Sequence, residues 1–187
     1  VCASVNHVVC HGIPSAKEIL KDGDIVNIDV AIIKDGWYGD TSRMYGVGHV
    51  HPQAQRLVDT TYEAMVAGIR AVKPGATLGD VGHACQEYAE SNGCGVIRDL
   101  TGHGIGREMH EDPPVYNYGV PGKGLRLRKG MTIAIEPMIN QGSFEVQQLS
   151  DGWTVKTIDG KLSAHYENTV ALTPDGVLNL TEVEIGE

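Results

Sequence analysis

The chain has 187 residues, and its composition is that of a folded globular protein. Hydrophobic residues make up 41%, enough for a buried core, which excludes a disordered tail and a miniprotein held together by disulfides. The formal net charge of −9 argues against nucleic acid as a partner. No apolar run approaches the roughly 18 residues that span a bilayer. Four cysteines without paired zinc spacing favour a reduced, cytoplasmic protein over a disulfide framework.

A hairpin and three later strands are predicted. The segment 25–33 is β-branched and apolar, 34–36 carries a turn signal, and 37–47 is expected to return as the second strand. Irregular chain is expected around Pro113 and Pro114. The later strands are predicted over 131–139, 153–158 and 166–172.

Two helices are predicted between the hairpin and the later strands. Pro52 suits a first helical position, and apolar residues then recur at helical spacing over 52–72. Thr77 and Asp80 match a capping box at the start of the second helix, which is expected to end at Asn92. The order of elements predicts an α+β fold in one domain over residues 1–187, with no internal linker.

Asp29 and Asp40 of the hairpin are the first candidate site residues. With either a two-residue turn or a four-residue loop they project from the same face, opposed or diagonal. Their like charges repel unless a cation lies between them. The alternative is that both belong to the wet face of a half-buried strand.

His103 is the second candidate, because glycines frame it in Gly102-His103-Gly104-Ile105-Gly106 and His110 follows soon after. Flanking glycines let the backbone adopt positive φ and approach a ligand closely. We therefore interpret the segment 101–111 as a site rather than as packing. Ordinary surface histidines are the alternative.

Glu136 and Glu167 are carboxylates in apolar strands. Pro137 cannot donate to a strand ladder, so the strand is expected to be broken or at an edge there. Ionised carboxylates are rarely buried unless they are paired or bound to metal. Four carboxylates with two divalent cations and one neutral imidazole would be electrically neutral, and such a set suits manganese, iron, cobalt or zinc. A metal pair that activates a shared water points to hydrolysis.

These segments together resemble the type I methionine aminopeptidases over essentially the whole chain. No long insertion separates His110 from Glu136, unlike in the type II enzymes. The resemblance lies in seven motifs: Asn6-His7-Val8-Val9-Cys10-His11-Gly12-Ile13-Pro14, Asp24-Ile25-Val26-Asn27-Ile28-Asp29, Gly39-Asp40-Thr41-Ser42, Gly102-His103-Gly104-Ile105-Gly106, Ile135-Glu136-Pro137-Met138, Asp151-Gly152-Trp153-Thr154 and His165-Tyr166-Glu167.

The resemblance implies a pita-bread fold and removal of the initiator methionine from nascent polypeptides, at the ribosome, by a hydroxide that bridges two divalent metals. Carried over by position, Asp29 and Asp40 bind one metal, and His103 and Glu136 bind the other. Asp40 and Glu167 bridge the two.

The resemblance also implies catalytic and binding roles. His110 is expected to bind the scissile carbonyl and its developing oxyanion, His11 to contact the substrate near the cleaved amide, and Glu136 to shuttle a proton to the leaving amine. Part of a methionine side-chain pocket is expected from Cys2, Met109 and Trp153. A monovalent cation is expected near Asn6, Val8 and Ser163.

The family's members carry further residues before the position of Val1, where a first helical pair is built. We therefore expect a partial catalytic domain that lacks the N-terminal helical pair and exposes apolar surface. Three alternatives to the assigned activity remain at this point. They are a prolidase or aminopeptidase P type of peptidase, a catalytically impaired fragment, and a pita-bread binding module without catalysis.

Overall fold

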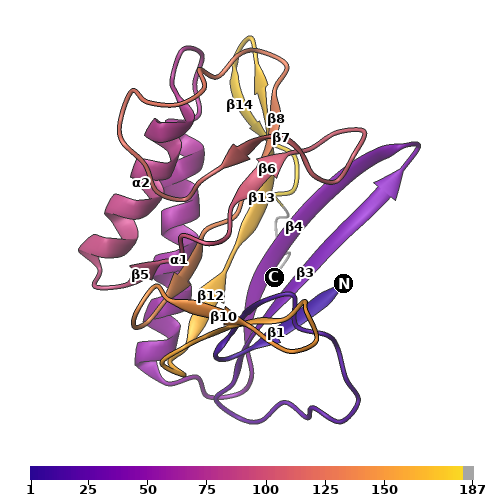
Figure 1. Ribbon diagram of the computed structural model, residues 1–187, viewed down its shortest axis with the longest axis vertical. Coiled ribbons are helices and arrows are strands. Elements are labelled where there is room, and N and C mark those ends of the chain that lie inside the picture. Colours follow the sequence, from indigo (N-terminus) through magenta and orange to yellow (C-terminus); the bar gives the residue numbers. More distant parts are fainter. Residues whose placement is uncertain (183–187) are drawn as a thin grey trace.

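A curled eight-stranded sheet forms the centre of the computed structural model, which describes residues 1–182 (Figure 1). The strand order is β1-β3-β4-β13-β8-β6-β7, with β14 paired to the outer part of β13. All of these pairings are antiparallel. The strands are β1 (Cys2–Val5), β3 (Ile25–Lys34), β4 (Trp37–Gly46), β6 (Gly102–Gly104), β7 (Glu111–Val115), β8 (Thr132–Ile135), β13 (Glu167–Thr173) and β14 (Gly176–Asn179).

Two smaller sheets of three strands each adjoin the main sheet, with orders β10-β11-β2 and β12-β9-β5. Strand β8 continues into β9 after Glu136 and Pro137, and β12 continues into β13 after Tyr166. The chain therefore passes from one sheet to another at the two glutamates of the candidate site. The bounds are β2 (Val8–Cys10), β5 (Gly95–Val96), β9 (Met138–Asn140), β10 (Val146–Gln148), β11 (Val155–Thr157) and β12 (Ser163–His165).

The helices α1 (Pro52–Ala71) and α2 (Leu78–Ser91) begin and end where local signals predict. Pro52 occupies the first turn of α1, where its missing N–H costs no intrahelical bond. Thr77 and Asp80 form a complete capping box on α2, and Asn92 caps its end. No helix within residues 1–182 is both long and apolar enough to cross a membrane.

The helix pair packs against the sheet and fixes its position. Gly68 of α1 lies against Cys85 of α2, and a Cβ atom at residue 68 would overlap the Cys85 sulfur, so glycine permits this close approach. Met65 and Cys85 share a buried cluster with Ile135 and Val170 from the two central strands. Burial of these apolar side chains holds β8 and β13 in place beneath the helices.

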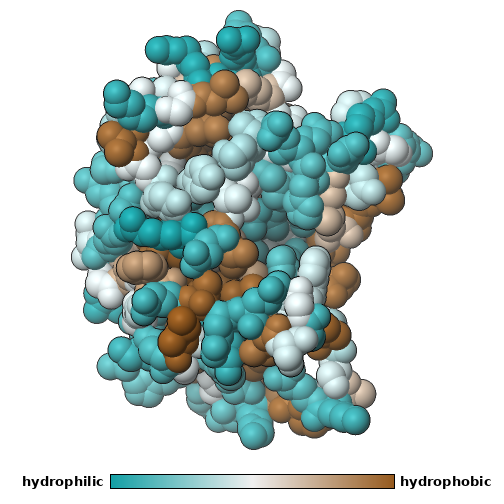
Figure 2. All heavy atoms as spheres, in the orientation of Figure 1, coloured by the Kyte–Doolittle hydropathy of each residue, from teal (hydrophilic) through white to brown (hydrophobic). Residues whose placement is uncertain are grey.

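The β3–β4 hairpin projects from the molecule (Figure 1). Its two-residue turn has positive φ at both Asp35 (53°) and Gly36 (77°), the conformation that matches the twist of paired strands. Apolar side chains are exposed along it, including Ile32 at 60% and Trp37 at 54%, and Figure 2 shows apolar surface on this projecting part. Arg107 stacks over the Trp37 ring and donates to the Gly36 carbonyl, which ties the tip to the chain after β6.

Two sequence interpretations need correction. Pro113 and Pro114 lie in strand β7 rather than in irregular chain. The strand tolerates them because it is at the sheet edge, where one side needs no ladder bonds. The segment 101–111 is not only a site loop, because Gly102 and Gly104 belong to β6 between β7 and β8. A Cβ at either glycine would overlap a neighbouring backbone carbonyl, so these glycines also serve packing.

Candidate metal centre

Five consecutive strands of the main sheet each contribute one candidate metal ligand. A cavity of about 190 Å³ is lined by all of them. The predicted ligand set therefore converges, although its members come from separate parts of the sequence. In sheet order the ligands are Asp29 on β3, Asp40 on β4, Glu167 on β13, Glu136 directly after β8, and His103 on β6.

The hairpin register confirms that the two aspartates share a face, and of the two predicted arrangements, opposed or diagonal, it shows the diagonal one. Asp29 pairs with Ser42, and Asp40 pairs with Ala31 on the opposite strand. Ser42 also pairs with Glu167 across the β4–β13 boundary. Asp29 and Glu167 therefore lie in one row across three strands, with Asp40 two residues away from that row.

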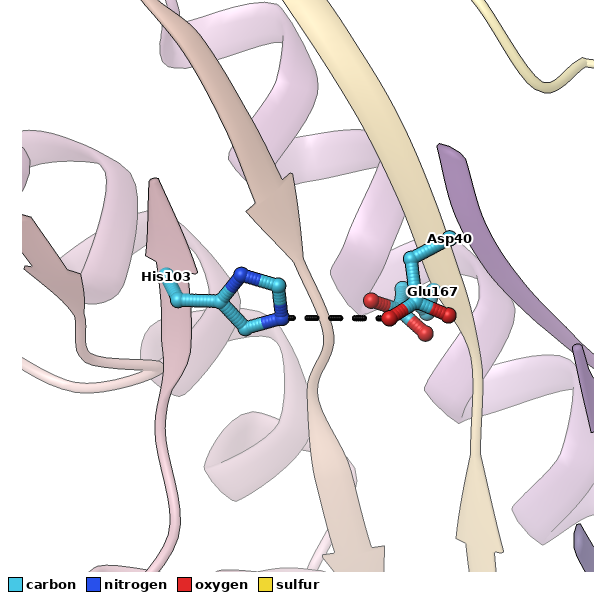
Figure 3. Close-up of side chains that lie close together, drawn as sticks. All are labelled: Asp40, His103 and Glu167. Carbon is cyan, nitrogen blue, oxygen red and sulfur yellow. Dashed lines mark ion pairs between the residues drawn. The ribbon is translucent and has the colours of Figure 1, made fainter. Parts of the chain in front are cut away.

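His103 has a fixed orientation that suits metal binding. Its Nδ1 donates to the Gly104 carbonyl at 2.8 Å, so Nε2 carries the lone pair. Nε2 lies 3.4 Å from Oε1 of Glu136 and 4.0 Å from Oδ2 of Asp40. Figure 3 shows the imidazole pointing at Asp40 and Glu167, and single ligand atoms of these three residues lie within 4.8 Å of one another. An imidazole lone pair facing carboxylate oxygens is a site for a cation.

The electrostatics of the cluster lead to the same conclusion. Burial, reinforced by neighbouring carboxylates, raises the pKa of Glu167 well above its usual value. Burial likewise raises the pKa of Glu136 to about 8 and that of Asp29 to about 6. Oδ1 of Asp40 and Oε1 of Glu167 are buried without a hydrogen-bond partner among the described residues. Unpaired buried oxygens and mutual repulsion fit a centre that is completed by divalent cations.

Backbone contacts that the sequence did not reveal hold two of the ligands. The Thr169 hydroxyl donates to the Asp40 carbonyl at 2.7 Å and accepts from the Asp40 N–H at 3.3 Å. The side chain of Asn117 donates to the Glu136 carbonyl at 3.0 Å, next to the strand break at Pro137. Thr169 resembles any strand residue in the sequence, and no local signal marks Asn117.

The two predicted catalytic histidines line the same cavity. The His110 ring meets the His103 ring edge to face at a centroid distance of 4.5 Å. His11 has positive φ (58°) and stacks on Trp153 at 4.4 Å. Partial burial lowers the pKa of His11, which keeps its imidazole neutral at pH 7. Both rings can therefore hydrogen-bond a ligand that enters the cavity beside the candidate metal-binding residues.

The predicted side-chain pocket adjoins the same centre. Cys2, Met109 and Trp153 line the cavity, and Cys2 pairs with Asp29 across β1 and β3. Trp153 is 48% exposed, so it is not an ordinary core residue. A wider cavity of about 770 Å³ shares His11 and Trp153 with the smaller one, and it provides space for a peptide.

Two of the three residues predicted near a monovalent cation are in contact. The Ser163 N–H donates to the Asn6 carbonyl at 2.9 Å. Val8 lies on the neighbouring strand β2, where it pairs with Lys156. The cation itself stays a prediction.

His165 is a buried neighbour of the centre that the sequence analysis did not single out. Its Nε2 lies 3.6 Å from Oε2 of Glu136. Burial lowers the pKa of this imidazole. Its position two residues before Glu167 is the one signal that marks it, because alternate residues along extended chain share a side.

Known proteins share this architecture. Residues 1–174 match the model of metallopeptidase family M24. The methionine aminopeptidase of Rickettsia prowazekii is 56% identical over 177 residues, which are 94% of this chain and 68% of that protein. Its crystal structure superposes with a TM-score of 0.95, covering 97% of this chain and 73% of that one. A prolidase from Pyrococcus furiosus is 25% identical, with a TM-score of 0.76 over 98% of this chain and 49% of that one.

The curled sheet with its helix pair is the pita-bread fold that methionine aminopeptidases and prolidases share. A further relative, the methionine aminopeptidase of Escherichia coli, is 50% identical, over 97% of this chain and 69% of that enzyme. The chain therefore belongs to metallopeptidase family M24, among the methionine aminopeptidases. Membership of a metallopeptidase family implies divalent metal binding, in agreement with the convergent ligands.

Proposed function

We propose that this chain removes N-terminal methionine from nascent polypeptides by metal-dependent hydrolysis. The observation that carries the proposal is the convergence of four carboxylates and one imidazole from five neighbouring strands on one cavity. Relatives with 50–56% identity are named methionine aminopeptidases, which supports methionine as the residue removed. We propose that the chain, residues 1–187, belongs to one catalytic domain.

The proposed centre holds two divalent ions, of cobalt, manganese, iron or zinc. Asp29 and Asp40 would hold one ion and His103 and Glu136 the other, with Asp40 and Glu167 shared. The positive charge of two divalent cations equals the negative charge of four ionised carboxylates, which supports this number of ions. When bound, the ions supply Lewis-acid chemistry that lowers the pKa of a water molecule and neutralises developing negative charge.

The protein's own groups complete the reaction. His110 donates to the scissile carbonyl and to its oxyanion. His11, held by its stack on Trp153, orients the substrate at the cleaved amide. Glu136 carries a proton toward the leaving amine.

The methionine side chain is proposed to contact Cys2, Met109 and Trp153, which line the cavity beside the ligands. Nascent chains as substrates place the proposed activity in the cytoplasm, at or near the ribosome. A monovalent cation among the oxygens of Asn6, Val8 and Ser163 is part of the same proposal.

The test is hydrolysis of the tripeptide Met-Ala-Ser by this chain after EDTA treatment and reloading with each of the four metals. An X-Pro dipeptide in parallel tests the prolidase alternative. We expect methionine release that EDTA abolishes and metal restores, with no cleavage of the X-Pro bond. The proposal is overturned by preferential X-Pro cleavage. It is also overturned if metal-loaded protein with a cooperative melting transition releases no methionine.

A further inference from the structure

His165 is a buried polar side chain that the proposed mechanism does not use. It is 2% exposed, and neither ring nitrogen has a hydrogen-bond partner among the described residues. Its backbone is held firmly, because Asn27 donates to its carbonyl at 2.6 Å and β12 pairs it with Met138. A fully buried imidazole with two unpaired nitrogens is costly unless it meets a polar group in the working state of the protein.

The polar group that this ring faces is the carboxylate oxygen Oε2 of Glu136. Nε2 of His165 lies 3.6 Å from Oε2, while the other oxygen, Oε1, lies 3.4 Å from Nε2 of His103. The carboxylate therefore lies between two imidazoles, one at each oxygen. The His165 contact is longer than an N–H···O bond, which a movement of about 0.6 Å would close.

The two imidazoles are not equivalent. His103 donates through Nδ1 to the Gly104 carbonyl, so its Nε2 has no proton to give to Glu136. Nδ1 of His165 has no acceptor among the described residues, so nothing draws the proton away from its Nε2. Oε1 is thus the oxygen left for a cation, and Oε2 is the oxygen that a ring N–H can hold.

We propose that His165 is a positioning residue, whose Nε2–H binds Oε2 of Glu136 and leaves Oε1 alone to face the metal centre. This inference rests on the proposed function and names the group that orients one of its ligands. Without the contact, the carboxylate can rotate and turn both oxygens to the cation. Glu136 would then be turned out of the orientation that the reaction needs, so kcat should fall while KM changes little.

Two amide variants separate this role from packing. His165→Gln keeps an N–H near the Nε2 position, whereas His165→Asn places its amide near the Nδ1 position and is the matched control. We expect His165→Asn to lower kcat by about 10-fold or more with KM within about 2-fold, and His165→Gln to stay within about 3-fold of the parent. The visible absorption spectrum of the cobalt-loaded protein should change in His165→Asn and persist in His165→Gln. Equal kcat in the two variants, or a cobalt spectrum unchanged in His165→Asn, overturns the proposal.

A measurement on the unaltered protein keeps the test independent of variant folding and of turnover. In the zinc-loaded protein, ring nitrogen chemical shifts from ¹⁵N NMR report which nitrogen carries the proton. We expect the proton of His165 on Nε2, and that of His103 on Nδ1. A proton on Nδ1 of His165 refutes the inference, whether or not the protein cleaves methionyl peptides. Failure of Met-Ala-Ser cleavage with the expected tautomers would instead overturn the proposed function alone.

Discussion

Metal loading should release protons, and a minimum number follows from the raised pKa values of the buried carboxyls. At pH 7 a carboxyl with a pKa of about 8, such as Glu136, is about nine-tenths protonated. Burial also raises the pKa of Glu167 well above its usual value. Asp29, with a pKa of about 6, is about one-tenth protonated. Glu136 and Asp29 together therefore retain about one proton in the metal-free cluster, and the raised pKa of Glu167 adds to this. Ligands bind metal in their deprotonated form, so full loading at pH 7 should release at least about one proton.

Titration calorimetry in two buffers with different ionisation enthalpies measures this release directly. Release of at least one proton also means that apparent metal affinity rises by about 10-fold or more per pH unit near pH 7. In the metal-free protein, carboxyls with raised pKa bind more protons when folded than when unfolded. Their contribution to stability is therefore present at low pH and is lost as the pH rises through the raised values. The melting-temperature increase on adding metal should accordingly grow from pH 6 to pH 8. Absence of proton release at pH 7 would refute the reasoning.

Three further outcomes are expected. His110→Ala should bind metal with unchanged affinity and lower kcat by ~10²-fold, since it removes one oxyanion donor; full activity of this variant would contradict the assigned role. Asp40→Asn and Glu167→Gln should each abolish methionine release, because an amide carries no charge to hold a shared cation. Undiminished turnover in either variant would contradict the role of that residue as a shared metal ligand. Thr77→Ala should lower the free energy of unfolding by about 1 kcal/mol, measured by urea denaturation, without altering KM.

The elements that local signals specify are the ones that the sequence predicts well. Pro52 and the capping box at Thr77 define helix starts through contacts within a few residues. The turn at Asp35-Gly36 sets the hairpin register, and this places Asp29 and Asp40 on one face. These features need no knowledge of the rest of the fold.

Features that depend on strand order are much harder to predict. Strand β6 is three residues long and glycine-rich, so nothing in its composition marks it as an inner strand of the sheet. The role of Thr169 follows only from the neighbouring position of β4 and β13. His165 faces Glu136 because two sheets meet at that point, which a linear pattern does not encode. The ligand types could be predicted from the sequence, whereas the hydrogen bonds that orient them could not.

The arrangement of one ligand on each of five adjacent strands restricts how the gene can change in length. Successive side chains on a strand alternate between its two sides, so inserting or deleting one codon between the hairpin turn and Asp40 would turn Asp40 away from the cavity while leaving the strand able to pair. Point substitutions remove a single ligand, but such a shift misplaces every later side chain of that strand. Changes of length should therefore be tolerated better in connecting segments such as 47–51, between β4 and α1, than within the strands.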